Sequence, residues 1–155
     1  MATLVREQIL SQIMKWVVNS GLDVESISNE KHDFAITMYE NRNLPQLQII
    51  HPKADTAYVL VAGLVSIPES DRKKLKELKR EQFDELIWDN KMRLLTMDVD
   101  FTVWGSEQDP DSWEVQKRVF LDETNTNHFH EACHKVKNAI ISIIWSYKRE
   151  LATTA

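Results

Sequence analysis

The amino-acid sequence predicts an α+β fold, in which an antiparallel, bent sheet of about five strands packs against three helices in the order α-β-β-β-α-β-β-α. Two observations support this prediction. Apolar residues recur at helical spacing in three segments and alternate with polar residues in the segments between them. The turns within each group of strands are too short for a parallel crossover, so neighbouring strands are expected to be antiparallel.

The helices are predicted from apolar stripes and from residues suited to helix ends. The first covers residues 4–20 and is followed by Gly21, which suits this position because glycine readily adopts the left-handed conformation. The second runs from about Ser70 to Asp89. The third is a long helix that follows candidate caps at residues 124–127 and continues to about Leu151.

The strands are predicted from alternating apolar and polar residues. The segment from Thr56 to Ile67 is apolar on both faces, which is typical of a central strand that is covered on both sides. In the segment from Leu95 to Val103, Asp98 and Asp100 are expected on a face exposed to water. The pattern leaves open whether residues 23–31 add a strand. The predicted strands are 34–39, 47–49, 56–67, 95–103 and 113–121.

Composition restricts the class of protein. A chain of 155 residues is expected to form a single domain, residues 1–155, and its net charge of −5 disfavours a dedicated nucleic-acid binder. The single cysteine, Cys133, permits neither an intramolecular disulfide nor a zinc ribbon. There is no signal-peptide pattern, and the longest apolar run, Ala57–Val65, is far shorter than the roughly 20 residues that span a bilayer. We therefore expect a cytoplasmic protein with no membrane partner.

One motif resembles a catalytic site. His130-Glu131-Ala132-Cys133-His134 matches the H-E-x-x-H pattern on a predicted helix. In zinc peptidases this spacing places two imidazoles on one helix face as ligands, and the glutamate polarises a metal-bound water. The motif therefore raises the hypothesis of a zinc-dependent hydrolase, in which His130 and His134 hold the metal and Glu131 is catalytic.

Two arguments weigh against this hypothesis. A catalytic zinc needs a third protein ligand, and the final helix occupies most of the chain after His134. Helical geometry also turns His130 and His134 about 120–160° away from the apolar stripe of the same helix. We therefore expect exposed histidines, no catalytic residue and no cofactor, and we keep zinc only as an alternative.

The outward face of the final helix stays apolar beyond the histidines. Ile141 and Trp145 continue this face, and Ile144 lies next to them in the sequence. A helix that is apolar nearly all round is usually buried on more than one side. The cover is either a second layer of the same domain or a partner, so Ile141, Ile144 and Trp145 are candidate interface residues for a homodimer or a protein client.

A basic run, Arg72–Arg80, lies in this acidic chain and could contact phosphates. Such a run is more often the solvated face of an amphipathic helix, and Glu77 and Glu81 are placed for pairing with basic neighbours one turn away. No base-stacking motif or recognition helix accompanies it. Nucleic-acid binding therefore stays a further alternative.

The chain also resembles known proteins at two levels. The order of its elements is similar to the type III secretion chaperone-like fold, in which dimers bind extended segments of a client. In sequence it resembles a small uncharacterised family, a domain of unknown function found mainly in archaea, through Ile13-Met-Lys-Trp16, Val119-Phe-Leu-Asp122 and the helix from Phe129 to Ile143. The family implies no activity, and likeness of fold constrains function only weakly.

The function expected from the sequence is that of a non-enzymatic protein-binding module, chaperone- or adaptor-like, which acts as a homodimer. The alternatives are the zinc-dependent hydrolase at His130 and His134 and nucleic-acid binding through Arg72–Arg80.

Overall fold

The computed structural model describes residues 6–39, 45–53, 56–106, 108–121 and 126–153. This part of the chain contains four helices and six strands, and every pair of neighbouring strands is antiparallel. The α+β class and the antiparallel sheet are thus confirmed. The predicted numbers of five strands and three helices are wrong, and each differs by one element for a local reason.

The elements follow one another in a simple order along the chain. They are α1 (Arg6–Asn19), β1 (Asp23–Ser28), β2 (Phe34–Tyr39), β3 (Leu47–His51), β4 (Tyr58–Ser66), α2 (Glu69–Leu75), α3 (Arg80–Leu95), β5 (Asp100–Ser106), β6 (Asp109–Phe120) and α4 (Thr126–Thr153). The strands form a single sheet in the order β1-β2-β3-β4-β6-β5. The predicted caps at 124 and 125 lie outside the described residues.

The additional strand is β1, within the polar segment whose structure the sequence left open. It pairs with β2 from Asp23 opposite Tyr39 to Ser28 opposite Ala35, with an irregularity between Val24 and Ser26. Most of its side chains are exposed because β1 is an edge strand. An edge strand that buries little has no apolar alternation, so its sequence carries no strand pattern.

The additional helix arises because the predicted helix from Ser70 to Asp89 is broken. The backbone of Lys79 is extended, with φ −58° and ψ 140°, and separates α2 from α3. Leu75 is buried on α2 and Phe83 on α3. The break lets each helix turn its own apolar stripe toward the core.

Helix α3 continues through Leu95, so the strand predicted from Leu95 to Val103 begins too early. The helix persists because Leu94, on the same stripe as Phe83 and Leu86, is buried. The chain then reverses at Asp98, whose φ is 55°, and β5 starts at Asp100. Asp98 therefore lies in the connection before β5 and not on a strand face.

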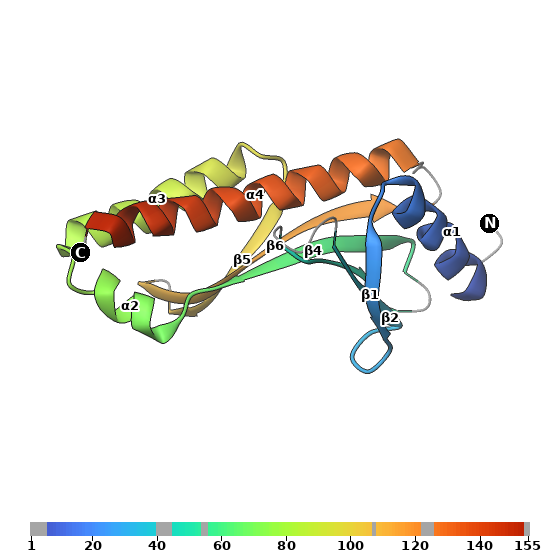
Figure 1. The fold of residues 1–155 in the computed structure, drawn as a ribbon, viewed down its shortest axis with the longest axis horizontal. Coiled ribbons are helices and arrows are strands. Elements are labelled where there is room, and N and C mark those ends of the chain that lie inside the picture. The colour runs from blue at the N-terminus through green and yellow to red at the C-terminus, as the bar shows by residue number, and fades with distance from the viewer. Residues whose placement is uncertain (1–5, 40–44, 54–55, 107, 122–125, 154–155) are drawn as a thin grey trace.

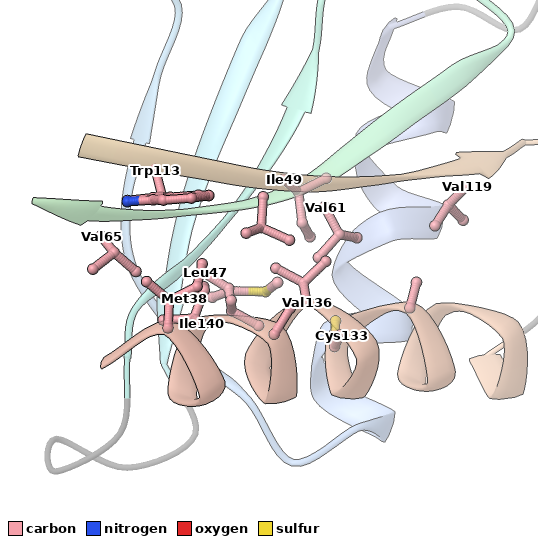
Figure 2. Packing of buried hydrophobic residues seen from close by; sticks show 14 of the residues in the cluster. Met38, Leu47, Ile49, Val61, Val65, Trp113, Val119, Cys133, Val136 and Ile140 are labelled. Carbon is pink, nitrogen blue, oxygen red and sulfur yellow. The ribbon is translucent and has the colours of Figure 1, made fainter. Parts of the chain in front are cut away.

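Helix α4 covers one face of the sheet and carries the centre of the core (Figure 1). Val136 and Ile140 of α4 face Val61 and Trp113 of the sheet, as Figure 2 shows. The predicted core stripe is confirmed, because all of its residues are buried: Phe129, Ala132, Cys133, Val136, Ala139, Ile140, Ile143 and Tyr147.

The remaining helices pack around the two ends of α4. Helix α1 lies at its N-terminal end, where Trp16 stacks on Phe129 with ring centres 5.6 Å apart (Figure 1). Helix α3 packs on the C-terminal half, where Ser146 donates a hydrogen bond of 2.9 Å to the Asn90 side chain. Within the described part of the chain, no helix is long and apolar enough to cross a bilayer.

Candidate binding groove

Strand β4 extends beyond its neighbour β3 and leaves part of its edge uncovered. The pairing between these strands ends where Gln48 lies opposite Ala62, whereas β4 continues to Ser66. On its other side β4 pairs with β6 along its whole length, from Tyr58 to Ser66. Among the described strands, none lies beside Leu64–Ser66 on the β3 side.

The backbone hydrogen bonds between β4 and β6 show which backbone groups of β4 face the open side. Ile67 donates its amide to the carbonyl of Asp111 at 2.8 Å, and Leu121 donates to the carbonyl of Ala57 at 2.9 Å. Odd-numbered residues of this strand therefore bond toward β6. Because successive residues in a strand direct their backbone groups to opposite sides, Leu64 and Ser66 present theirs to the open side.

This edge forms the floor of a groove of about 1180 Å³, which we call the β4-edge groove. One wall is the C-terminal half of α4, with Ile141, Ile144 and Trp145. The other wall is the outer face of β2 and β3, which contributes Ala35 and Ile50. The groove thus combines a strand edge with two partly apolar walls.

The three interface residues proposed from the sequence all line this groove. Trp145 is 69% exposed, and Ile141 and Ile144 are partly buried against the core or the sheet edge. Leu64, 58% exposed, adds a second large apolar side chain that the sequence did not single out. The sequence did contain a signal for Leu64. The apolar segment from Thr56 to Ile67 is much longer than the neighbouring strand predicted at 47–49, so part of it was bound to extend beyond that strand.

Helix α4 can lie this close to β4 because residue 63 is glycine. A Cβ atom there would collide with the Cδ1 of Ile140 and lie 3.2 Å from its Cγ1. The buried Ile140 cannot move aside easily in a packed core. Gly63 therefore fixes the height of α4 above the sheet and the depth of the groove.

Charges of both signs surround the groove. Glu30, Lys31 and Lys148 line it, and Glu114 accepts a hydrogen bond of 3.0 Å from the Trp104 indole. Neither sign dominates this rim. The groove therefore offers apolar contact and backbone hydrogen bonds more than attraction to one kind of charge.

The H-E-x-x-H motif lies on α4, away from the groove floor. Nε2 of His130 and Nε2 of His134 are 2.9 Å apart, so the spacing does bring the two rings together. Glu131 instead pairs with Lys135, with Oε1 and Nζ 3.2 Å apart. Within the described ranges, no group of three His, Cys, Asp or Glu side chains is placed to hold a metal ion.

Asp98 forms ion pairs with two lysines, one of which lies on the side of α4 that carries Glu131. The Nζ atoms of Lys117 and Lys135 each lie 2.8 Å from Oδ2 of Asp98. Hydrogen bonds from Lys117 and then Lys135 lower the pKa of Asp98 to about 2. The network links the turn before β5 to β6 and α4, and Lys135 joins Glu131 to it.

Much of the basic run is paired with carboxylates. Arg72 and Lys76 both contact Oδ2 of Asp109, at 3.1 and 3.0 Å. Lys73 pairs with Glu69, and Arg80 pairs with Asp84. The run thus holds α2 against β6, which leaves less positive charge for phosphate contacts.

Comparison with known proteins gives a family and a fold. A structure of an uncharacterised protein from Methanothermobacter thermautotrophicus is similar to the chain, with a TM-score of 0.82 and 20% sequence identity over 92% of this chain and 99% of that one. At this identity the likeness shows the fold alone. No curated protein matches the chain. The sequence model of an uncharacterised conserved protein family, DUF2299, matches residues 9–147, and the chain therefore belongs to the DUF2299 family.

Proposed function

We propose that the protein is a non-enzymatic binding module that holds an extended segment of a partner protein in the β4-edge groove. The segment adds to β4 as a further strand, with backbone hydrogen bonds to Leu64 and Ser66. The observation that carries the proposal is the open strand edge next to exposed Leu64 and Trp145. Strand addition of this kind takes its affinity from backbone bonds and its specificity from pockets for alternate side chains.

The size of the groove favours a peptide over a small ligand. At about 1180 Å³ it exceeds the roughly 300–1,000 Å³ of typical small-molecule pockets. Its mixed rim charge also gives no reason to expect a strongly charged ligand. The partner segment that fits best is extended, with apolar residues at alternate positions that reach Leu64 on one side and Trp145 on the other.

Selection from a display library of random decapeptides tests this proposal directly. We expect the selected peptides to share alternating apolar residues and to bind the purified chain. Trp145→Glu should reduce their affinity at least about tenfold, because a charge replaces a large apolar contact on the α4 wall of the groove. Trp88→Glu is the matched control, since Trp88 is 62% exposed on α3 and does not line the groove.

Backbone methylation separates strand addition from simple apolar adhesion. A selected peptide that is N-methylated at alternate residues keeps its side chains but loses its amide donors on one edge. We expect one of the two methylation registers to abolish binding and the other to preserve it, because a strand bonds to its neighbour through alternate residues. Equal binding of both registers, or equal binding by the Trp145→Glu variant, would exclude the proposed mode.

We also propose that the protein acts as a homodimer. The order of its elements resembles the type III secretion chaperone-like fold, in which dimers bind extended client segments, and this resemblance is the support for the proposal. The zinc-dependent hydrolase is not favoured, since among the described residues no third metal ligand joins His130 and His134.

A further inference from the structure

His130 and His134 form a pair whose geometry suits a metal ion, independently of the groove. Both side chains are exposed on α4, with ring centres 4.4 Å apart and ring planes inclined at 79°. The 2.9 Å between their Nε2 atoms means that one ring donates a hydrogen bond to the other. The two Nε2 atoms therefore lie close enough for both to reach one cation beside the line that joins them.

The separation of the two nitrogens is short enough for both to bind one metal ion. With metal–nitrogen bonds of about 2.0–2.1 Å, neighbouring ligands at 90° have nitrogens about 2.9 Å apart, whereas a tetrahedral angle requires about 3.3–3.4 Å. The 2.9 Å of the hydrogen bond between the rings is nearer the first value, so the pair reaches a 90° arrangement with the smaller movement. Square-planar and tetragonal sites with nitrogen and oxygen ligands are typical of Cu²⁺ and Ni²⁺, and Cu²⁺ binds most tightly in the divalent series.

The recess beside the pair supplies a place for a coordinated water. A recess of about 20 Å³ is lined by both histidines and by Ser20 at the end of α1. This volume suits one water molecule. The Ser20 Oγ is buried and has no hydrogen-bond partner among the described residues, so it can accept a hydrogen bond from a metal-bound water.

From these observations we propose that His130 and His134 bind one Cu²⁺ or Ni²⁺ ion, with water completing its coordination. On binding, the proton on Nε2 of the donor ring moves through solvent to the Nδ1 of the same ring, so that both Nε2 lone pairs coordinate the ion. Within the described residues, no third His, Cys, Asp or Glu side chain joins the pair to complete the ligand set of a zinc peptidase. The site is one of metal binding, at the junction of α1 and α4, and not one of hydrolysis.

Titration of the untagged protein with CuCl₂ tests the site. We expect one tightly bound equivalent, with an electron paramagnetic resonance spectrum that shows coupling to two imidazole nitrogens. Loss of a residue that hydrogen-bonds to a metal ligand typically weakens metal binding by roughly 10- to 100-fold. His134→Ala removes a ligand itself and should weaken Cu²⁺ binding by more than this. Ser20→Ala removes only the partner of the bound water and should weaken it by about tenfold. His32→Ala is the matched control, because His32 is an exposed histidine on another segment.

The variants separate this site from other sources of copper affinity. Both histidines are exposed, so the alanine variants should fold, and their circular dichroism spectra verify this. Lys137 also lines the recess, and Lys137→Gln should tighten binding because it removes a positive charge near the ion. The proposal is overturned if the double variant His130→Ala, His134→Ala binds Cu²⁺ as tightly as the natural protein, or if the natural protein binds none.

Discussion

At the scale of single residues, the Trp113–Tyr147 pair joins the sheet to α4 at a buried position. The Trp113 indole donates a hydrogen bond of 2.9 Å to the Tyr147 hydroxyl, and their side chains are 0% and 4% exposed. Tyr147→Phe keeps the ring but leaves the indole donor without its acceptor. We expect the free energy of unfolding to fall by about 1–3 kcal/mol in urea denaturation. Tyr58→Phe should change it little, because the Tyr58 contacts with Phe120 and Arg118 involve the ring.

The same hydroxyl predicts a loss of stability at alkaline pH. Burial raises the pKa of Tyr147 to about 12, against about 10 in an unfolded chain. Its contribution to stability is therefore complete below pH 10 and declines as pH rises toward 12, by up to about 1.4 kcal/mol per pH unit. The Tyr147→Phe variant should lack this part of the decline, and an identical alkaline profile in both proteins would contradict the assignment.

The burial of the His51 side chain was not predicted from the sequence. His51 lies two residues beyond the strand predicted at 47–49 and directly before Pro52, yet its side chain is completely buried. Its Nδ1 lies 2.6 Å from Oδ2 of Asp33, and its Nε2 lies 2.8 Å from the carbonyl oxygen of Thr56. Asp33 comes near His51 only when β2 pairs with β3, and the Thr56 carbonyl comes near it only through the connection between β3 and β4, so the alternation of apolar residues does not reveal either partner.

At the scale of elements, the turn from α3 to β5 depends on Asp98 in two ways. Its φ of 55° is a left-handed conformation, and its carboxylate accepts hydrogen bonds from Lys117 and Lys135. Asp98→Asn keeps a residue that tolerates this conformation but removes the charge. Asp98→Ala removes both, and we expect it to be less stable than Asp98→Asn by about 1 to 2 kcal/mol in thermal or urea unfolding.

Acid titration isolates the charge contribution of Asp98. Because its folded pKa of about 2 lies below the unfolded value near 3.9, the ion pairs stabilise the protein above pH 4 and this contribution is lost as pH falls toward 2. The Asp98→Asn variant should lack that part of the acid transition. A variant with an acid profile identical to that of the natural protein would show that the lysines do not stabilise the fold.

The spacing of apolar residues predicted most helices and strands correctly. It failed where one continuous pattern runs across two elements, as it does from α2 to α3 and from α3 to β5. The apolar stripe of the region 70–89 steps by five residues from Leu78 to Phe83, which turns it by about 140° on a continuous helix. This step was the available signal for the break between α2 and α3. Leu95, Met97 and Val99 alternate like a strand, but burial of Leu94 extends α3 through Leu95.

The sequence predicted the α4 wall of the candidate groove but not its open strand edge. Trp145 and Ile141 could be identified because the period of a single long helix shows which residues leave the core stripe. The open edge at Leu64 and Ser66 depends on where β3 ends relative to β4, which is a matter of register between strands. The unequal lengths of the two apolar segments hinted at this overhang. Alternation excludes a shift in register by one residue but not by two, which keeps the same side chains on the core face.

At the scale of the whole molecule, Trp145 could contact either a bound peptide or the second copy of the chain in the proposed homodimer. If a second copy occupied the groove, peptide and partner would exclude each other. If the dimer uses another surface, both can bind at once. We expect the second arrangement, because an open strand edge between two partly apolar walls suits an extended segment better than a folded copy.

Light scattering after size exclusion distinguishes the two arrangements. We expect a mass of twice the 18.1 kDa of the chain, unchanged by a saturating decapeptide from the selection or by Trp145→Glu. A dimer that dissociates with peptide, and equally with Trp145→Glu, would assign the groove to self-association. A monomer under all conditions would exclude the homodimer yet leave the peptide-binding proposal intact, since backbone bonds to Leu64 and Ser66 require only one copy of the chain.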